Sequence, residues 1–94
     1  MRYETISHWT ATEWTAEMEA LAKNSFIPMI ISAGANSVQM IRTGDLTFSV
    51  ITQYEDEEAA SAAQAKIADI RSKAASDLPM QMVSAHAGAV FASS

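Results

Sequence analysis

The chain has 94 residues, which is enough for one compact domain and too few for two. Six basic and eleven acidic residues give a net charge of −5, so we expect no nucleic-acid partner. The chain has no cysteine, which excludes disulfides, thiolate metal sites and a cysteine nucleophile. Hydrophobic residues make up 49% of the sequence, and this proportion predicts a folded domain.

Targeting and membrane-spanning patterns are not found in the sequence. The N-terminus lacks a basic segment followed by an apolar run. The most apolar stretch, residues 26–35, is about ten residues long and contains Pro28, whereas a membrane-spanning helix needs roughly twenty. We therefore expect a cytoplasmic protein with no membrane partner.

Residues 3–9 predict the first strand, because β-branched and aromatic side chains dominate the segment. Successive side chains of a strand point to opposite faces of the sheet. One face is predicted to carry Tyr3, Thr5, Ser7 and Trp9, and the other Arg2, Glu4, Ile6 and His8. The two aromatic side chains are thus expected opposite His8.

A helix is predicted after this strand, with two possible N-caps. Thr10 and Glu13 have the spacing of a capping box, in which each side chain bonds the backbone N–H of the other. Thr12 is the competing N-cap. The buried stripe of this helix is predicted to contain Trp14 and Met18.

Pro28 complicates the end of that helix, because proline lacks a backbone donor and its ring clashes with the carbonyl four residues earlier. Either the helix ends near Asn24 and a short second one begins at Phe26, or one helix continues with a kink. We expect a kinked or broken helix that ends at Ala33 and is followed by Gly34.

Residues 37–43 and 46–54 predict two strands of a hairpin. The connection Gly44-Asp45 is typical of a two-residue primed turn, in which Gly44 adopts a positive φ. Alternation along the second of these strands predicts one face with Leu46, Phe48, Val50, Thr52 and Tyr54.

Residues 56–75 predict a second helix, since acidic residues stand at its start, where the helix dipole favours them. Its buried stripe is predicted to be Ala59, Ala63, Ile67, Ile70 and Ala74. Residues 80–91 then predict the last strand, with a kink or bulge at Gly88. One face of that strand is expected to carry Met80, Met82, Ser84 and His86.

The strand–helix–strand–strand–helix–strand order predicts a single ferredoxin-like α+β domain over residues 1–94. Its four-stranded antiparallel sheet would have both helices on one face. The other face would then carry large side chains exposed to water, which is unfavourable for a monomer. We therefore expect a homodimer that packs through this open face.

Several short segments resemble the dimeric α+β barrel superfamily, which includes antibiotic-biosynthesis monooxygenase-like proteins and stress-responsive barrel proteins. They are Gly34–Val38 before the second strand, Arg42–Gly44 at the hairpin, and Tyr54–Asp56 before the alanine-rich helix. The resemblance implies a homodimer whose two sheets close into a barrel. It also implies, in some members, a ligand pocket between sheet and helices.

Five side chains are candidates for a site. His8 and His86 are the candidate catalytic residues, because a histidine near neutral pH serves as a general base. A two-histidine metal site and two unrelated polar residues are the alternatives, and we expect neither a metal nor a cofactor. Trp9, Tyr3 and Arg42 are the candidate ligand-binding residues, since Arg42 could bind a carboxylate or phenolate. Packing, or an ion pair of Arg42 with an acid, is the alternative.

Two functions follow from these expectations. One is a non-enzymatic ligand-binding or stress-related module whose interior is filled by side chains. The alternative is a cofactor-independent monooxygenase-like or isomerase-like enzyme that acts on a small aromatic or apolar metabolite. A cavity of several hundred Å³ would count against the filled interior.

Overall fold

The computed structural model describes residues 2–94. Strand β1 (Tyr3–Ala11) is followed by helix α1 (Ala16–Leu21), the π-helical segment η1 (Ala22–Phe26) and helix α2 (Ile27–Ser32). The chain continues through β2 (Ser37–Arg42), β3 (Thr47–Tyr54), α3 (Glu57–Asp77) and β4 (Met80–Ala89). This order confirms the predicted succession of strands and helices.

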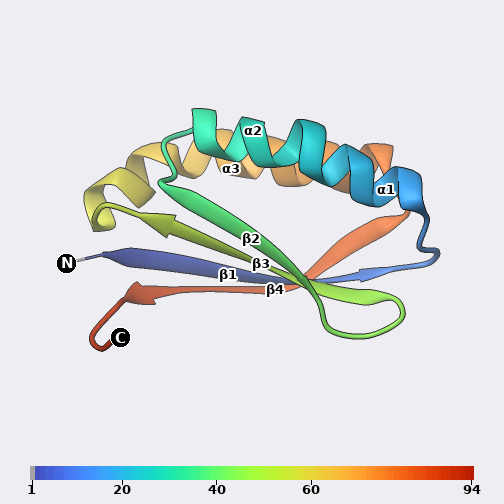
Figure 1. Cartoon of the computed structure of the whole chain (residues 1–94). Helices are drawn as coiled ribbons and strands as arrows, with labels where there is room; N and C mark the ends of the chain where they lie inside the picture. The colour runs from blue at the N-terminus through green and yellow to red at the C-terminus, as the bar shows by residue number, and fades with distance from the viewer. Residues whose placement is uncertain (1) are drawn as a thin grey trace.

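The four strands form one sheet in the order β2-β3-β1-β4, and all neighbouring strands are antiparallel. The helices all lie on one side of this sheet (Figure 1). α3 contacts β1, β3 and β4, and α2 contacts β2. The predicted ferredoxin-like α+β fold is therefore confirmed. We call the side without helices the open face.

The first helix begins later than predicted. Thr10 belongs to β1, which extends to Ala11, and Thr12 lies in the loop. The N-cap is Thr15, whose hydroxyl accepts the backbone N–H of Met18 at 3.1 Å. The N–H groups of Ala11 and Thr12 instead donate to carbonyls of the β2–β3 and α3–β4 loops. These bonds to distant segments keep the chain extended, so both predicted N-caps are wrong.

Pro28 neither ends the helix nor leaves it regular. The chain remains helical through η1, where the N–H of Ile27 donates to the carbonyl of Ala22, five residues earlier. This wider turn lies directly before the proline and relieves the crowding of its ring against the preceding turn. The helix ends at Ser32, and Gly34 follows with φ +124°. The helix thus ends one residue before the predicted Ala33, which is its C-cap, and the predicted glycine follows.

The β2–β3 connection is wider than the predicted primed turn. Gly44 has no positive φ; among the described residues, that conformation occurs at Gly34. The N–H groups of Thr43 and Gly44 both donate to the carbonyl of Thr47, at 3.0 and 3.3 Å. A Cβ on Gly44 would lie 2.6 Å from Oγ1 of Thr47. Close approach, and not backbone handedness, accounts for this glycine.

The bulge in β4 lies at Val83 instead of Gly88. The register of β4 on β1 shifts between His8 and Trp9, so that Val83 has no partner. Gly88 pairs regularly with Glu4. Because a bulge adds one residue, it reverses the alternation of the residues beyond it.

This bulge separates residues that were predicted to share a face. Met80 and Met82 pair with buried residues of β1 and face the helices. Ser84 and His86 lie beyond the bulge and face the open side. The expectation that all four share one face is wrong. It assumed regular alternation along the whole strand, and the unpaired Val83 interrupts that alternation.

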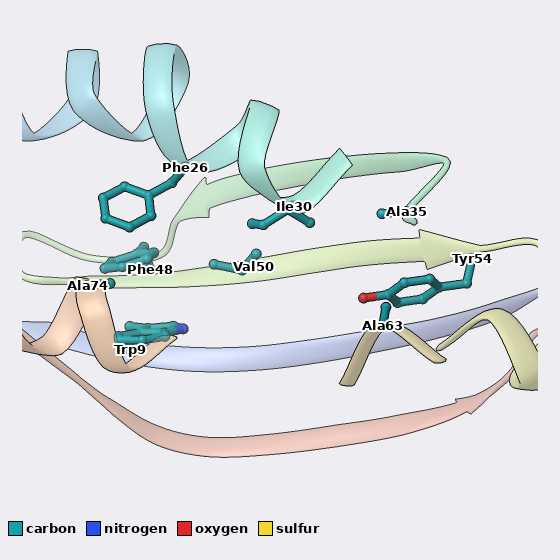
Figure 2. Packing of buried hydrophobic residues seen from close by; sticks show 9 residues of the cluster. All are labelled: Trp9, Phe26, Ile30, Ala35, Phe48, Val50, Tyr54, Ala63 and Ala74. Carbon is teal, nitrogen blue, oxygen red and sulfur yellow. The ribbon is translucent and has the colours of Figure 1, made fainter. Parts of the chain in front are cut away.

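The core lies between the sheet and the helices (Figure 2). The rings of Trp9 and Phe48 stack with centroids 5.9 Å apart and an interplanar angle of 11°. From α3, Ala63 and Ala74 are buried, while Ala59, Ile67 and Ile70 pack against the same cluster. The predicted stripe of α3 is confirmed, and its small residues allow the helix to approach the sheet closely.

Candidate functional site

The two histidines lie together on the open face. His8 in β1 and His86 in β4 have ring centroids 6.3 Å apart, with an interplanar angle of 61°. Nδ1 of His8 shares a hydrogen bond of 2.8 Å with the hydroxyl of Ser49 in β3. Both histidine side chains are exposed. The geometry therefore brings together the two residues that were considered as a catalytic pair.

Trp9 and Tyr3 lie on the other side of the sheet, facing the helices. Trp9 is 5% exposed, and its Nε1 donates to the hydroxyl of Ser7 at 2.8 Å. Tyr3 is half-buried near the other end of β1. The sheet thus separates these aromatic rings from the imidazole of His8, as the strand alternation predicted.

Arg42 lies at the hairpin end of β2. Its guanidinium donates to the carbonyls of Gly44 and Asp45 at 3.2 and 2.8 Å and stands 4.4 Å from the centroid of the Trp14 ring. Trp14 lies before α1, and its Nε1 donates to Glu19 at 2.6 Å. Arg42 therefore closes the β2–β3 loop and covers an indole.

Three of the hollows on the helix side of the sheet have strand residues in their lining. The first, called the inner cavity, has a volume of about 60 Å³. Its lining is mainly apolar and includes Trp9, Phe26, Ile30, Phe48 and Val50. Figure 2 shows these side chains converging between the sheet and the helices.

The second hollow, called the tyrosine pocket, has a volume of about 290 Å³ and lies between α3 and strands β1, β3 and β4. Its polar lining comes from Tyr3, Tyr54, Ser61, Gln64 and Arg71. His86 also borders it, at the edge strand. Ile67 and Arg71 line both this pocket and the inner cavity, so the two hollows adjoin.

The third hollow, called the methionine pocket, has a volume of about 400 Å³ and lies beside α1 and η1. Its lining includes Met18, Met40 and Met80, with Trp14 and Arg42. The three predicted ligand-binding residues are therefore divided among three hollows. Two of these hollows have volumes of several hundred Å³ and open to the surface, whereas the inner cavity among the core residues holds about 60 Å³.

Tyr54 and Arg71 were not among the predicted site residues. Tyr54 is 1% exposed, and burial raises the pKa of its phenol above 10.0, while the charge of Arg71 opposes that rise. Within residues 2–94 the one ion pair joins Lys73 and Asp77, so Arg71 has no carboxylate partner there. A sequence signal existed: Arg71 is four residues after Ile67, beside the buried stripe of α3. A basic residue near the end of a helix is, however, equally typical of a favourable interaction with the helix dipole.

Residues 2–94 contain no group of three or more histidine and acidic side chains placed to hold a metal ion. No helix in the same range is long and apolar enough to cross a membrane.

The fold is shared with solved oxygenases of similar length. SnoaB, a cofactor-independent oxygenase from Streptomyces nogalater, superposes with a TM-score of 0.74 at 14% identity, over 98% of this chain and 95% of that one. The monooxygenase ActVA-Orf6 of Streptomyces coelicolor, solved with nanaomycin D, has a TM-score of 0.62 at 21% identity, over 97% and 92%.

A dimeric ferredoxin-like protein from an uncultured marine organism has a TM-score of 0.64 at 11% identity, over 99% of this chain and 97% of that one. No protein-family model and no curated protein sequence matches the chain. The neighbours are thus antibiotic-biosynthesis monooxygenase-like proteins of ferredoxin-like fold, which confirms the resemblance at the level of the fold.

Proposed function

We propose that this protein binds a flat, largely apolar aromatic molecule between its sheet and α3. The observation that carries the proposal is the junction of the tyrosine pocket with the inner cavity at Ile67 and Arg71. Ligand sites are mainly apolar and contain a few placed polar groups, as this junction does. The aromatic rings of the ligand would point toward the inner cavity, with a phenol or carboxylate at the polar end.

The polar groups of the tyrosine pocket indicate which chemical group the polar end of the ligand carries. Arg71 offers guanidinium donors that are not engaged by a carboxylate within residues 2–94, and guanidinium groups bind carboxylate and phenolate oxygens well. The phenol of Tyr54 is protonated at neutral pH, as an ordinary tyrosine is, and burial raises its pKa further, so its hydroxyl serves as a donor. Both groups favour an oxygen-bearing, anionic substituent.

Binding is tested with nanaomycin D as the probe, by quenching of tryptophan fluorescence. A Trp14→Phe background leaves Trp9, at the inner cavity, as the reporter. We expect Arg71→Met to raise the dissociation constant at least fivefold, since it removes the cation and keeps the apolar stem. His8→Ala, on the open face, is the control and leaves the constant unchanged. Equal affinity of Arg71→Met and the parent protein would overturn the proposed site.

A second candidate function is oxygenation of the bound molecule without a cofactor. The neighbours SnoaB and ActVA-Orf6 support this candidate, since both share the fold and are oxygenases. The probe is 1,8-dihydroxyanthrone, a polycyclic phenol. Its central methylene loses two hydrogens and becomes a carbonyl, while the second atom of dioxygen leaves as water.

An oxygen electrode measures that reaction. Dioxygen uptake above the spontaneous rate, reduced in Arg71→Met, would support the enzyme. Binding of nanaomycin D with no added uptake would support the non-enzymatic module instead.

We also propose a homodimer that packs through the open face. Ile6, Ile41 and Ile51 lie on three neighbouring strands of this face, and Ile6 and Ile41 are 36% and 43% exposed. Two exposed isoleucines on either side of the half-buried Ile51 favour a protein partner. The dimeric ferredoxin-like neighbour supports a second copy of the chain as that partner.

A further inference from the structure

Two methionines stand between the inner cavity and the methionine pocket. Met40 of β2 and Met80 of β4 line both hollows, together with Ala22 and Phe48. We propose that Met40 and Met80 form a movable wall, whose displacement into the methionine pocket determines how far a ring system extends inward from the tyrosine pocket. The inference rests on the ligand site proposed above and adds the residues that determine the size of the ligand.

The inner cavity is too small for an aromatic ring while its lining stays in place. An apolar cavity that binds one benzene ring has a volume of roughly 150 Å³, whereas the inner cavity has about 60 Å³. A ring that enters it must therefore displace side chains. The methionine pocket, with a volume of about 400 Å³, lies directly beyond the shared lining residues and has room to receive them.

The two methionines move more easily than their neighbours around the inner cavity. Trp9 and Phe48 are 5% and 8% exposed, and their rings stack with centroids 5.9 Å apart (Figure 2). Ile30 and Val50 are buried and branched at Cβ, which restricts their rotation. Both methionines are half-buried, and a methionine side chain is unbranched with three rotatable bonds. A ring that enters the inner cavity therefore displaces the methionines first.

The rim of the methionine pocket is held by contacts that do not involve the two methionines. The ring of Trp14 meets Phe48 edge to face, with centroids 5.6 Å apart, and the guanidinium of Arg42 lies 4.4 Å from the Trp14 centroid. On the helix side, Ala22 of η1 contributes only a methyl group to the shared lining. The methionine side chains thus have space to turn while the rim stays in place.

The test compares a long and a short aromatic carboxylate. Anthracene-2-carboxylate has three fused rings and benzoate has one, so only the first extends from the tyrosine pocket into the inner cavity. Met40→Ile combined with Met80→Ile nearly conserves side-chain volume and removes flexibility. We expect the dissociation constant of anthracene-2-carboxylate to rise at least fivefold and that of benzoate to stay unchanged. Isothermal titration calorimetry measures the first constant, and NMR titration measures the second.

The opposite substitution should have the opposite effect. Met40→Ala combined with Met80→Ala removes the wall, so the dissociation constant of anthracene-2-carboxylate should fall at least threefold. A general loss of packing would instead weaken binding in both double variants. Met29→Ile is the matched control and should leave both constants unchanged. Met29 packs against the same core from α2, but it borders a different hollow, between α2 and α3.

The outcomes separate a failure of the wall from a failure of the ligand site. Arg71→Met could weaken the binding of anthracene-2-carboxylate while both methionine double variants bind it as the parent protein does. In that case the ligand site stands and the movable wall is overturned. If the parent protein binds neither carboxylate, the ligand site is wrong and the wall is overturned with it.

Discussion

Tyr54 combines nearly complete burial with a neighbouring positive charge. Its side chain is 1% exposed, and Arg71 lies close enough to lower the pKa that burial raises. The pKa of this phenol therefore depends on the charge at position 71. Measurement of the pKa of Tyr54 therefore tests the geometry of the tyrosine pocket without a ligand.

Removal of the positive charge should raise the pKa of Tyr54 further. In Arg71→Met the desolvation of the phenol persists while the attraction between tyrosinate and guanidinium is lost. The measurement is a spectrophotometric titration of tyrosinate in a Tyr3→Phe background, which leaves Tyr54 as the remaining tyrosine. Arg71→Lys keeps the charge and is the control. An unchanged midpoint in Arg71→Met would show that the two groups do not interact.

The raised pKa of Tyr54 also predicts a loss of stability in alkali. The unfolded chain releases this proton near pH 10.0, while the folded chain keeps it to a higher pH. The folded state therefore binds more protons in that window, and the free energy of unfolding falls as pH rises above about 10. Urea unfolding at pH 9 and pH 11 measures the difference. The decline should be smaller in Tyr54→Phe, and an equal decline in both proteins would contradict the assignment.

At the scale of the elements, helix caps depend on contacts that are distant in sequence. The acidic residues predicted at the start of α3 are there, and one of them, Asp56, is also its N-cap, because its carboxylate accepts the N–H of Ala59 at 2.8 Å. Thr15 caps α1 because β1 continues to Ala11 and postpones the helix. The spacing of Thr10 and Glu13 was a valid capping pattern, but sheet pairing took priority over it.

Substitution of the observed cap should destabilise the protein. Thr15→Ala removes the acceptor for the Met18 N–H, and we expect a loss of about 1 kcal/mol in the free energy of unfolding. Thr12→Ala removes a threonine that the sequence pattern favoured and the structure does not use as a cap, so its effect should be smaller. Chemical denaturation of both variants gives the comparison. A larger loss in Thr12→Ala would move the cap back to the predicted position.

A second pair of matched variants tests the close approach of Gly44 to Thr47 in the β2–β3 hairpin. Gly44→Ala would place a Cβ 2.6 Å from Oγ1 of Thr47, and we expect a cost of about 1–3 kcal/mol. Gly88→Ala is the control, since a Cβ there meets no atom within 4 Å. Thermal unfolding compares them. Addition of Thr47→Ala should reduce the cost of Gly44→Ala, and an undiminished cost would rule out the clash as its cause.

The features of the fold that could be predicted from the sequence were those that depend on the periodicity of a single strand or helix. Alternation placed Trp9 opposite His8, and the stripe of α3 was correct from Ala63 to Ala74, because each depends on neighbours along one element. The bulge at Val83 depends on how two strands pair. No local pattern marks it, so the shared face of Met82 and His86 was predicted wrongly.

At the scale of the whole molecule, the same limit applies to the candidate site. The approach of His8 to His86 follows from the register of β1 on β4, which the sequence left undetermined. The tyrosine pocket needs Tyr54 from β3 and Arg71 from α3 on one side of the sheet. Residues from separate elements meet only through tertiary packing, so a lone arginine in a helix could not be recognised as a pocket residue.

The proposed dimer gives the last prediction, because it concerns a surface that belongs to no single element. Size-exclusion chromatography with light scattering should give twice the mass of the chain. Ile6→Glu combined with Ile41→Glu puts charges on two exposed positions of the open face and should yield a monomer. Leu21→Glu is the matched control: Leu21 is 37% exposed, close to the 36% of Ile6, but lies on α1, on the helix side. A dimer that persists in the double variant and dissociates in Leu21→Glu would place the interface on the helices.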